Sequence, residues 1–366
     1  MRRRNLLAVV GVTAAGGAAT AYGVSQRDSD ENGGTGDDEN ESDGNGDDES
    51  GSEGSSDESA DEEADDEQAD DLEERLEGSE GMLVFTYDDS PIEDYTLTYQ
   101  VHQEYDVPGC VAACPGWMED GGGDEYLSPD QLREMHDDGW GVMSHTYYHR
   151  ALGKIQLTET ALEGDDRIYV EANRHADIEE DPLVIFDDEN RTTATVAGGG
   201  SDSTGEYVEL AEPLEETIDA SGHVRYPEEF MQNILDETDA QLEEWGLTVL
   251  GFVYTYTRYH GLIEDLVRDH YEAVANHRFG GGHNEIDGLD PTTMQRMYIE
   301  TDRATEEEIE EFMQTAAEDD VLSIVGGHSQ FETITEERLR YTIETALEHD
   351  LAIVTMEEAL DELELR

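Results

Sequence analysis

The sequence contains very little positive charge. Among its 366 residues only 20 are lysine or arginine, against 94 aspartates and glutamates, and the formal net charge is −74. The single lysine is Lys154. This imbalance excludes a nucleic-acid-binding protein that works through a basic patch, and it equally excludes electrostatic attachment to anionic lipid.

Cysteine is also scarce, since the chain contains only Cys110 and Cys114. Two cysteines alone do not make a zinc site. Along an extended strand their Cα atoms would lie about 13 Å apart, which is too far for a disulfide. We therefore expect two buried thiols. A turn before Cys114 would permit a bridge if the protein is exported to an oxidising compartment.

The acidic residues extend along most of the chain. Segment 28–80 holds 26 of them beside one arginine, and the rest follow residue 80. The resulting repulsion fades in molar salt, where the Debye length shrinks to about 3 Å from about 8 Å at physiological ionic strength. Apolar runs at 82–85 and 322–325 argue against a wholly disordered chain. We therefore expect a protein adapted to concentrated salt, as in an extreme halophile.

The first 27 residues resemble an export signal. Three arginines precede an apolar run rich in alanine and glycine, and residues 19–21 have the small-x-small pattern of a cleavage site. Residues 3–7 (RRNLL) resemble a twin-arginine signal. We expect an extracellular or cell-surface location, with an uncleaved membrane anchor of about 20 residues as the alternative. Segment 28–80 is expected to be a disordered acidic linker.

From residue 81 to the end, short apolar runs alternate with amphipathic stretches. This alternation is typical of α/β proteins with a parallel sheet, and about seven strands in this length favour a barrel. The expected strands are 82–87, 110–113, 141–144, 248–254, 273–275, 322–325 and 352–355. The expected helices are 93–105, 129–138, 227–245, 261–270, 305–319, 336–349 and 357–363.

Residues 155–225 interrupt this alternation. They contain short β-type runs separated by turns rich in glycine and aspartate, without a helical pattern. We interpret them as a β-rich insertion. The remainder of 81–366 is about the right size for one α/β catalytic domain.

Carboxylates and imidazoles follow three expected strands at their C-terminal ends. Asp88 and Asp89 follow the first strand, His145 and His149 the third, and His328 a later one. Functional groups of parallel α/β barrels gather at this end, so we expect the five side chains to converge. Two imidazoles and one carboxylate can form a three-ligand hydrolytic metal site, and a second carboxylate beside it is a natural general base. Each pair alone has a simpler explanation, such as a helix N-cap or exposed histidines.

These segments resemble the motifs of the polysaccharide deacetylase family, which is carbohydrate esterase family four with the NodB homology domain. The stretch VFTYDDSP resembles the family's T-F-D-D-G-P motif, and LSPDQLREMHDDGWGVMSHTYYH resembles its helix, glycine and H-S/T-x-x-H segment. LSIVGGHSQF and LAIVTMEEAL resemble its closing strand, histidine and final strand–helix, and DVPGCVAACPGWM fits its second strand. The resemblance covers 82–152 and 226–363.

The resemblance implies a distorted (β/α)7 barrel that hydrolyses N-acetyl groups to acetate and a free amine. Carried over to this sequence, it implies Asp88 as catalytic base and His328 as general acid. It also implies Asp89, His145 and His149 as ligands of a divalent metal, which we expect to be Zn²⁺.

The sequence departs from the family pattern at two motifs. Ser90 replaces the glycine of the first motif, which is tolerable if its φ is negative. In the third motif Val253 and Thr255 occupy the usual arginine and proline positions, so the arginine that orients the base is missing. Arg258 is a candidate replacement or simply a surface residue, and the amide of Tyr256 is a candidate oxyanion donor. The positions of His260, His277 and His283 are ambiguous.

We therefore expect an exported, metal-dependent deacetylase that acts on an N-acetylated polysaccharide or surface glycan. One alternative is a non-catalytic glycan-binding protein on the same fold, favoured by the altered third motif and opposed by the complete metal set. Another is an amidohydrolase that cleaves a small non-sugar amide. No nucleic-acid partner is expected, and membrane contact is expected only through the possible N-terminal anchor.

Overall fold

The computed structural model describes residues 72, 75–319 and 321–366. The expected export signal at 1–27 and nearly all of the expected linker at 28–80 lie outside the described residues. Among the described residues, no helix combines the length and apolar character that a bilayer crossing requires.

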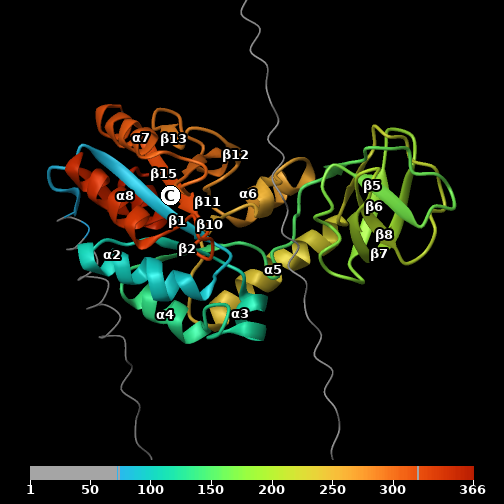
Figure 1. Cartoon of the computed structure of the whole chain (residues 1–366), viewed down its shortest axis with the longest axis horizontal. Helices are drawn as coiled ribbons and strands as arrows, with labels where there is room; N and C mark the ends of the chain where they lie inside the picture. The colour runs from blue at the N-terminus through green and yellow to red at the C-terminus, as the bar shows by residue number, and fades with distance from the viewer. Residues whose placement is uncertain (1–71, 73–74, 320) are drawn as a thin grey trace, which may run out of the picture. The chain divides into compact units, whose positions relative to one another are not determined.

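A curled, mainly parallel sheet forms the centre of the fold (Figure 1). Its central strand, β1 (Gly81–Asp88), pairs with β15 (Val321–Gly327) along one edge. Along the other edge it pairs first with β16 (Leu351–Val354) and then with β2 (Cys110–Ala113). Asp88 is therefore carried to the C-terminal end of the sheet, between the ends of β2 and β15.

The sheet continues from β2 through β3, β10 and β11, and from β15 through β14 and β12, with β13 antiparallel to β15. These strands are β3 (Gly141–Ser144), β10 (Gly251–Phe252), β11 (Ala273–Val274), β12 (Arg278–Phe279), β13 (His283–Glu285) and β14 (Gln295–Tyr298). The seam of the curl is linked by a 2.8 Å hydrogen bond from the His277 amide to the Met294 carbonyl. The expected α/β class with a distorted barrel is thus confirmed.

Alternate residues of β1 are buried on opposite faces of the sheet. Leu83 and Phe85 pack in a cluster with the outer helices, whereas Met82 and Val84 pack with inward-facing residues of β2, β3, β11, β15 and β16. Burial on both faces explains why the sequence of β1 is continuously apolar. It also shows that the sheet encloses a filled core.

Helices cover the outside of the sheet, with α2, α4, α7 and α8 around β1 and β15 (Figure 1). They are η1 (a π-helix, Asp94–Tyr99), α2 (Gln100–Tyr105), α3 (Pro115–Gly121), α4 (Pro129–Asp137), α5 (Glu228–Glu244), η2 (Thr255–Thr257), α6 (Leu262–His270), η3 (Pro291–Thr293), α7 (Glu306–Glu318), α8 (Glu336–Glu348) and α9 (Met356–Glu362). Capping boxes begin α4, α7 and α9, as their Ser or Thr start signals indicate.

The sequence-based element assignment missed α3 and strands β12 to β14. These strands are short, and β14 has the polar sequence QRMY, so no apolar run marks it. The stretch expected as one helix at 93–105 begins as a π-helix and becomes α-helical at Gln100. Cys110 and Cys114 are buried free thiols, as expected.

Residues 155–225 form a second, antiparallel sheet with the order β4-β9-β6-β7-β8-β5. Its strands are β4 (Ile155–Gln156), β5 (Arg167–Val170), β6 (Pro182–Phe186), β7 (Arg191–Ser201), β8 (Glu206–Leu210) and β9 (His223–Arg225). Ile168 and Val208 of this sheet belong to the same buried apolar cluster as Met231 of α5 and Phe252 of β10. The insertion therefore shares a core with one flank of the barrel.

Candidate active site

The turn after β1 presents two consecutive carboxylates. Asp88 ends the strand, and Asp89 and Ser90 follow with φ values of +78° and +53°. The condition of a negative φ for Ser90 is therefore not met. Left-handed backbone costs a non-glycine residue about 1–2 kcal/mol, and one compensating contact is the hydrogen bond that Ser90 Oγ accepts from the Cys114 amide at 2.9 Å.

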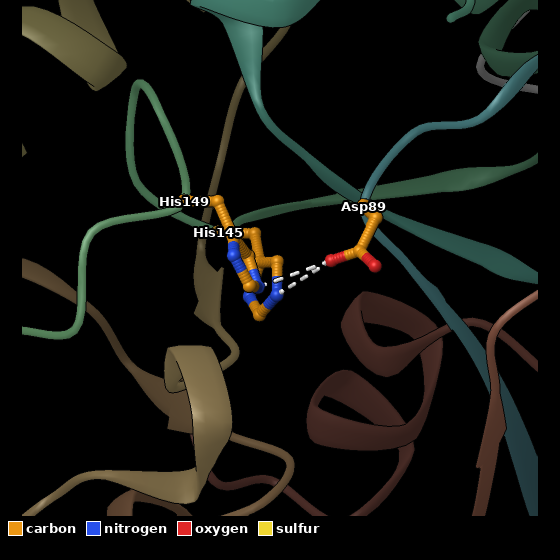
Figure 2. A group of neighbouring side chains, drawn as sticks. All are labelled: Asp89, His145 and His149. Atoms are coloured by element: carbon orange, nitrogen blue, oxygen red, sulfur yellow. Dashed lines mark ion pairs between the residues drawn. The ribbon is translucent and has the colours of Figure 1, made fainter. Parts of the chain in front are cut away.

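Asp89, His145 and His149 meet beside this turn (Figure 2). One carboxylate oxygen of Asp89, Oδ1, lies 3.4 Å from His145 Nε2 and 3.1 Å from His149 Nε2. One donor atom from each residue lies within 4.8 Å of the other two. His145 Nδ1 lies 2.7 Å from the Val253 carbonyl, which can only accept, so Nδ1 carries the proton and Nε2 keeps its lone pair for the site.

Two features show that these residues fit a divalent cation. Asp89 Oδ1 is buried without a hydrogen-bond donor among the described residues, while Oδ2 accepts from Gln330 Nε2 at 2.7 Å. A buried carboxylate oxygen without a donor is expected where a cation completes the site. Burial also lowers the pKa of His149 to about 4, so its imidazole is neutral and can bind metal. Two imidazole nitrogens and one carboxylate oxygen suit Zn²⁺ and similar ions.

Asp88 is held by a different partner, Arg296 on β14. Arg296 Nη1 donates to Asp88 Oδ1 at 2.8 Å and Nη2 donates to Oδ2, and both residues are buried. Burial alone would raise the pKa of Asp88, but the charge and hydrogen bonds of Arg296 more than offset this, so the pKa lies below its ordinary value. Asp88 is therefore ionised at neutral pH and fixed in orientation.

His328, at the end of β15, faces Asp88 across the site. Its Nε2 lies 3.7 Å from Asp88 Oδ2, and its Nδ1 donates to Glu300 at 2.6 Å. Its ring stacks between Tyr298 and Phe331, with centroids 5.7 and 5.0 Å away. Burial alone would lower the pKa of His328, but Glu300, Asp89 and Asp88 raise it to about 9. The imidazole is thus a cation with a proton to give.

The two remaining predicted site residues lie in different places. Tyr256 has a φ of +54°, and its ring lies 4.5 Å from that of His149, so it belongs to the site. Arg258 lies 3.6 Å from Glu171 of the insertion, and the arginine that contacts Asp88 is Arg296.

The three ambiguous histidines have partners of their own. His277 pairs with Glu264 at 3.0 Å, and His283 Nδ1 lies 2.8 Å from Ser323 Oγ. His260 packs against Tyr259, with ring centroids 4.3 Å apart.

Sequence reasoning missed Arg296 and Glu300, which orient the two residues expected to move protons. The available signal was a period of two, in which Arg296, Tyr298 and Glu300 alternate with Met297 and Ile299. The Ile299 amide still donates to the Gly326 carbonyl at 3.0 Å, so hydrogen bonding between the two chain segments continues to the residue before Glu300. A strand with this alternation places its polar side chains on one face of the sheet and its apolar side chains on the other.

Comparison with solved structures gives weak likenesses. A chitin deacetylase from the fungal pathogen Colletotrichum lindemuthianum is 15% identical, with 76% of this chain and 86% of that chain covered and a TM-score of 0.42. A family 4 carbohydrate esterase from Streptomyces lividans, in complex with acetate, is 9% identical over 77% and 96%, with a TM-score of 0.43. A CE4 family pseudoenzyme from Bacillus anthracis is 11% identical over 77% and 66%, with a TM-score of 0.43.

No curated protein sequence matches this chain. The family model of polysaccharide deacetylases, however, matches residues 75–177. This stretch contains both carboxylates of the β1 turn and both imidazoles that face Asp89. Residues 75–177 are therefore similar to the polysaccharide deacetylase family in the part of the chain that carries these four side chains.

Proposed function

We propose that this protein is an exported, metal-dependent polysaccharide deacetylase that hydrolyses the N-acetyl groups of an extracellular glycan. The observation that carries the proposal is the pairing of an ionised carboxylate, Asp88, with a protonated imidazole, His328, next to a three-residue metal site. Amide hydrolysis needs one group to accept a proton and another to donate one. The opposite effects of Arg296 and Glu300 on the two pKa values supply such a pair.

Asp89, His145 and His149 would hold the divalent ion. Such an ion, expected to be Zn²⁺, supplies Lewis acidity toward a carbonyl oxygen and lowers the pKa of water. Asp88 removes the proton of the attacking water, and Arg296 keeps this carboxylate ionised and aimed. The backbone amide of Tyr256 is the proposed oxyanion donor.

His328 then gives its Nε2 proton to the departing nitrogen as the C–N bond breaks, which yields acetate and a free amino sugar. Glu300 holds the opposite ring nitrogen and stabilises the imidazolium before this transfer. Without that proton, the departing nitrogen is a much poorer leaving group. The reaction therefore needs both Asp88 and His328.

Export is part of the proposal and is supported by residues 1–27 of the sequence. The altered third motif favoured a non-catalytic glycan-binding protein. Arg296 weakens that argument because it occupies the role that the motif left open.

The test is acetate release from N-acetylglucosamine oligomers by the full chain in molar salt, with Zn²⁺ and then with a chelator. We expect release that the chelator stops and added metal restores. Asp88→Asn is nearly isosteric and should lower turnover by about 10²-fold or more. A zinc-loaded wild-type protein that binds the oligomers without releasing acetate would instead indicate a binding protein.

A further inference from the structure

The β insertion reaches the active site through the segment 171–181, which connects β5 to β6. The guanidinium carbon of Arg174 lies 4.3 Å from the ring centroid of Tyr256, and Asp177 accepts a hydrogen bond from the Tyr256 hydroxyl at 3.3 Å. The Tyr256 ring in turn contacts the imidazole of His149. A single side chain therefore separates the insertion from a proposed metal ligand.

This segment is anchored at His175, which lies between Arg174 and Asp177, and at Asp181, which follows them. Asp181 accepts hydrogen bonds from Nε and Nη2 of Arg150 at 2.7 and 3.1 Å, and Arg150 directly follows His149. His175 is fully buried and packs edge-on against Tyr226, with centroids 4.7 Å apart. Fixed backbone holds side chains in place before a ligand arrives, which reduces the entropy lost on binding.

Arg174 is half-buried, and its charge acts on the nearby Asp177 carboxylate. Among the described residues it forms no direct ion pair, although the sequence is dominated by acids. Three other arginines around the site do form ion pairs. Arg150 pairs with Asp181, Arg258 with Glu171 and Arg296 with Asp88. A guanidinium that is not held in an ion pair keeps N–H donors available for a ligand.

The hydrogen-bonding groups of Arg174, Asp177 and Tyr256 suit a sugar ligand. Arg174 offers N–H donors, the exposed Asp177 offers a carboxylate acceptor, and Tyr256 contacts both of them. Each sugar hydroxyl both donates and accepts, so adjoining donors and acceptors around an aromatic ring can bind neighbouring hydroxyls together. A free anion would be repelled by Asp177, which disfavours a simple anion site.

We propose that Arg174, Asp177 and Tyr256 form a subsite for the sugar unit next to the one that loses its acetyl group. This inference rests on the proposed deacetylase function and makes the insertion a specificity element. The expected ligand is a hydroxyl-rich hexose or hexosamine unit within a chain. Longer substrates should therefore be preferred to single N-acetylated sugars.

The test compares kcat/KM for N-acetylglucosamine monomer and tetramer in the zinc-loaded full chain. We expect the tetramer-to-monomer ratio to exceed one in wild type and to fall about tenfold in the Arg174→Ala, Asp177→Ala double variant. The single variant Asp177→Asn should lower it less. Arg191 is an exposed residue at the start of β7 in the same insertion, so Arg191→Ala is the matched control and should leave the ratio unchanged. Circular dichroism in the same salt confirms that each variant is folded.

An unchanged ratio in the folded double variant, or no length preference in wild type, would overturn the subsite. If wild type releases no acetate at all, the proposed function fails, and tetramer binding by calorimetry then decides the subsite separately. Binding that weakens about tenfold in the double variant but not in Arg191→Ala would support it, and equal or absent binding in all proteins would overturn it.

Discussion

Replacing Glu300 by glutamine is expected to lower the pH at which activity is lost on the alkaline side. Glu300 is 1% exposed and accepts the Nδ1 proton of His328 at 2.6 Å. Burial alone would lower the pKa of His328, and the carboxylates around it raise that pKa to about 9. A general acid works while it is protonated, so activity should persist below this pKa and decline above it.

The expected shift follows from the strength of this contact. A hydrogen bond to a charged group contributes about 1.5–3 kcal/mol, and one pKa unit corresponds to about 1.36 kcal/mol. Glutamine preserves the shape but removes the charge, so the alkaline limit should move down by about one to two pH units. A metal ion bound at Asp89 would offset the charge of that carboxylate equally in wild type and in Glu300→Gln. The difference in the pKa of His328 between the two proteins is therefore preserved.

The assay is the pH profile of kcat/KM for acetate release from the N-acetylglucosamine tetramer, measured in molar salt with Zn²⁺. Glu336→Gln is the matched control, because Glu336 is an exposed residue of α8 that pairs with Arg340. Its profile should match wild type. Coincident alkaline limits in wild type and Glu300→Gln would refute the role of His328 as an acid tuned by Glu300.

Three further outcomes are expected. Arg296→Met should lower the free energy of unfolding by about 3–5 kcal/mol, because it removes the hydrogen-bonded partner of the buried Asp88 carboxylate. Denaturant titration in molar salt measures this, and a loss below about 1 kcal/mol would contradict it. Phe331→Ala should change the thermal midpoint little, because Phe331 is 38% exposed. It should nevertheless lower kcat/KM several-fold, because it removes the stacking on His328. Unaltered kinetics would speak against this role. Dilution from molar to about 0.1 M salt should lower the thermal midpoint, because the net charge of −74 is then poorly screened, and an unchanged midpoint would exclude salt adaptation.

The parts of the fold that sequence could predict are the strands buried on both faces. β1, β2, β15 and β16 are apolar over most of their length, so their positions were visible. The carboxylates and imidazoles that follow β1, β3 and β15 were visible as well. β14 was not visible, because its sequence QRMY contains no apolar run.

The arginine that contacts Asp88 could not be found by inspecting the residues near the altered third motif. The sequence suggested Arg258, close to the altered motif, but the chain places Arg296 next to Asp88 because β14 pairs with β15 and β15 pairs with β1. Such adjacency comes from strand order, which the local pattern does not contain. The contact of Arg174 with Tyr256 depends likewise on how the insertion packs, and no motif marks it.

The most direct test of the central claim is the metal content of the purified full chain, measured by mass spectrometry after dialysis against Zn²⁺ and then buffer in molar salt. We expect about one ion per chain in wild type and in Asp88→Asn. We expect a near-complete loss in folded Asp89→Asn and His149→Ala, because each removes a ligand of the site. A folded wild-type protein without metal, or folded ligand variants that keep a full equivalent, would contradict it.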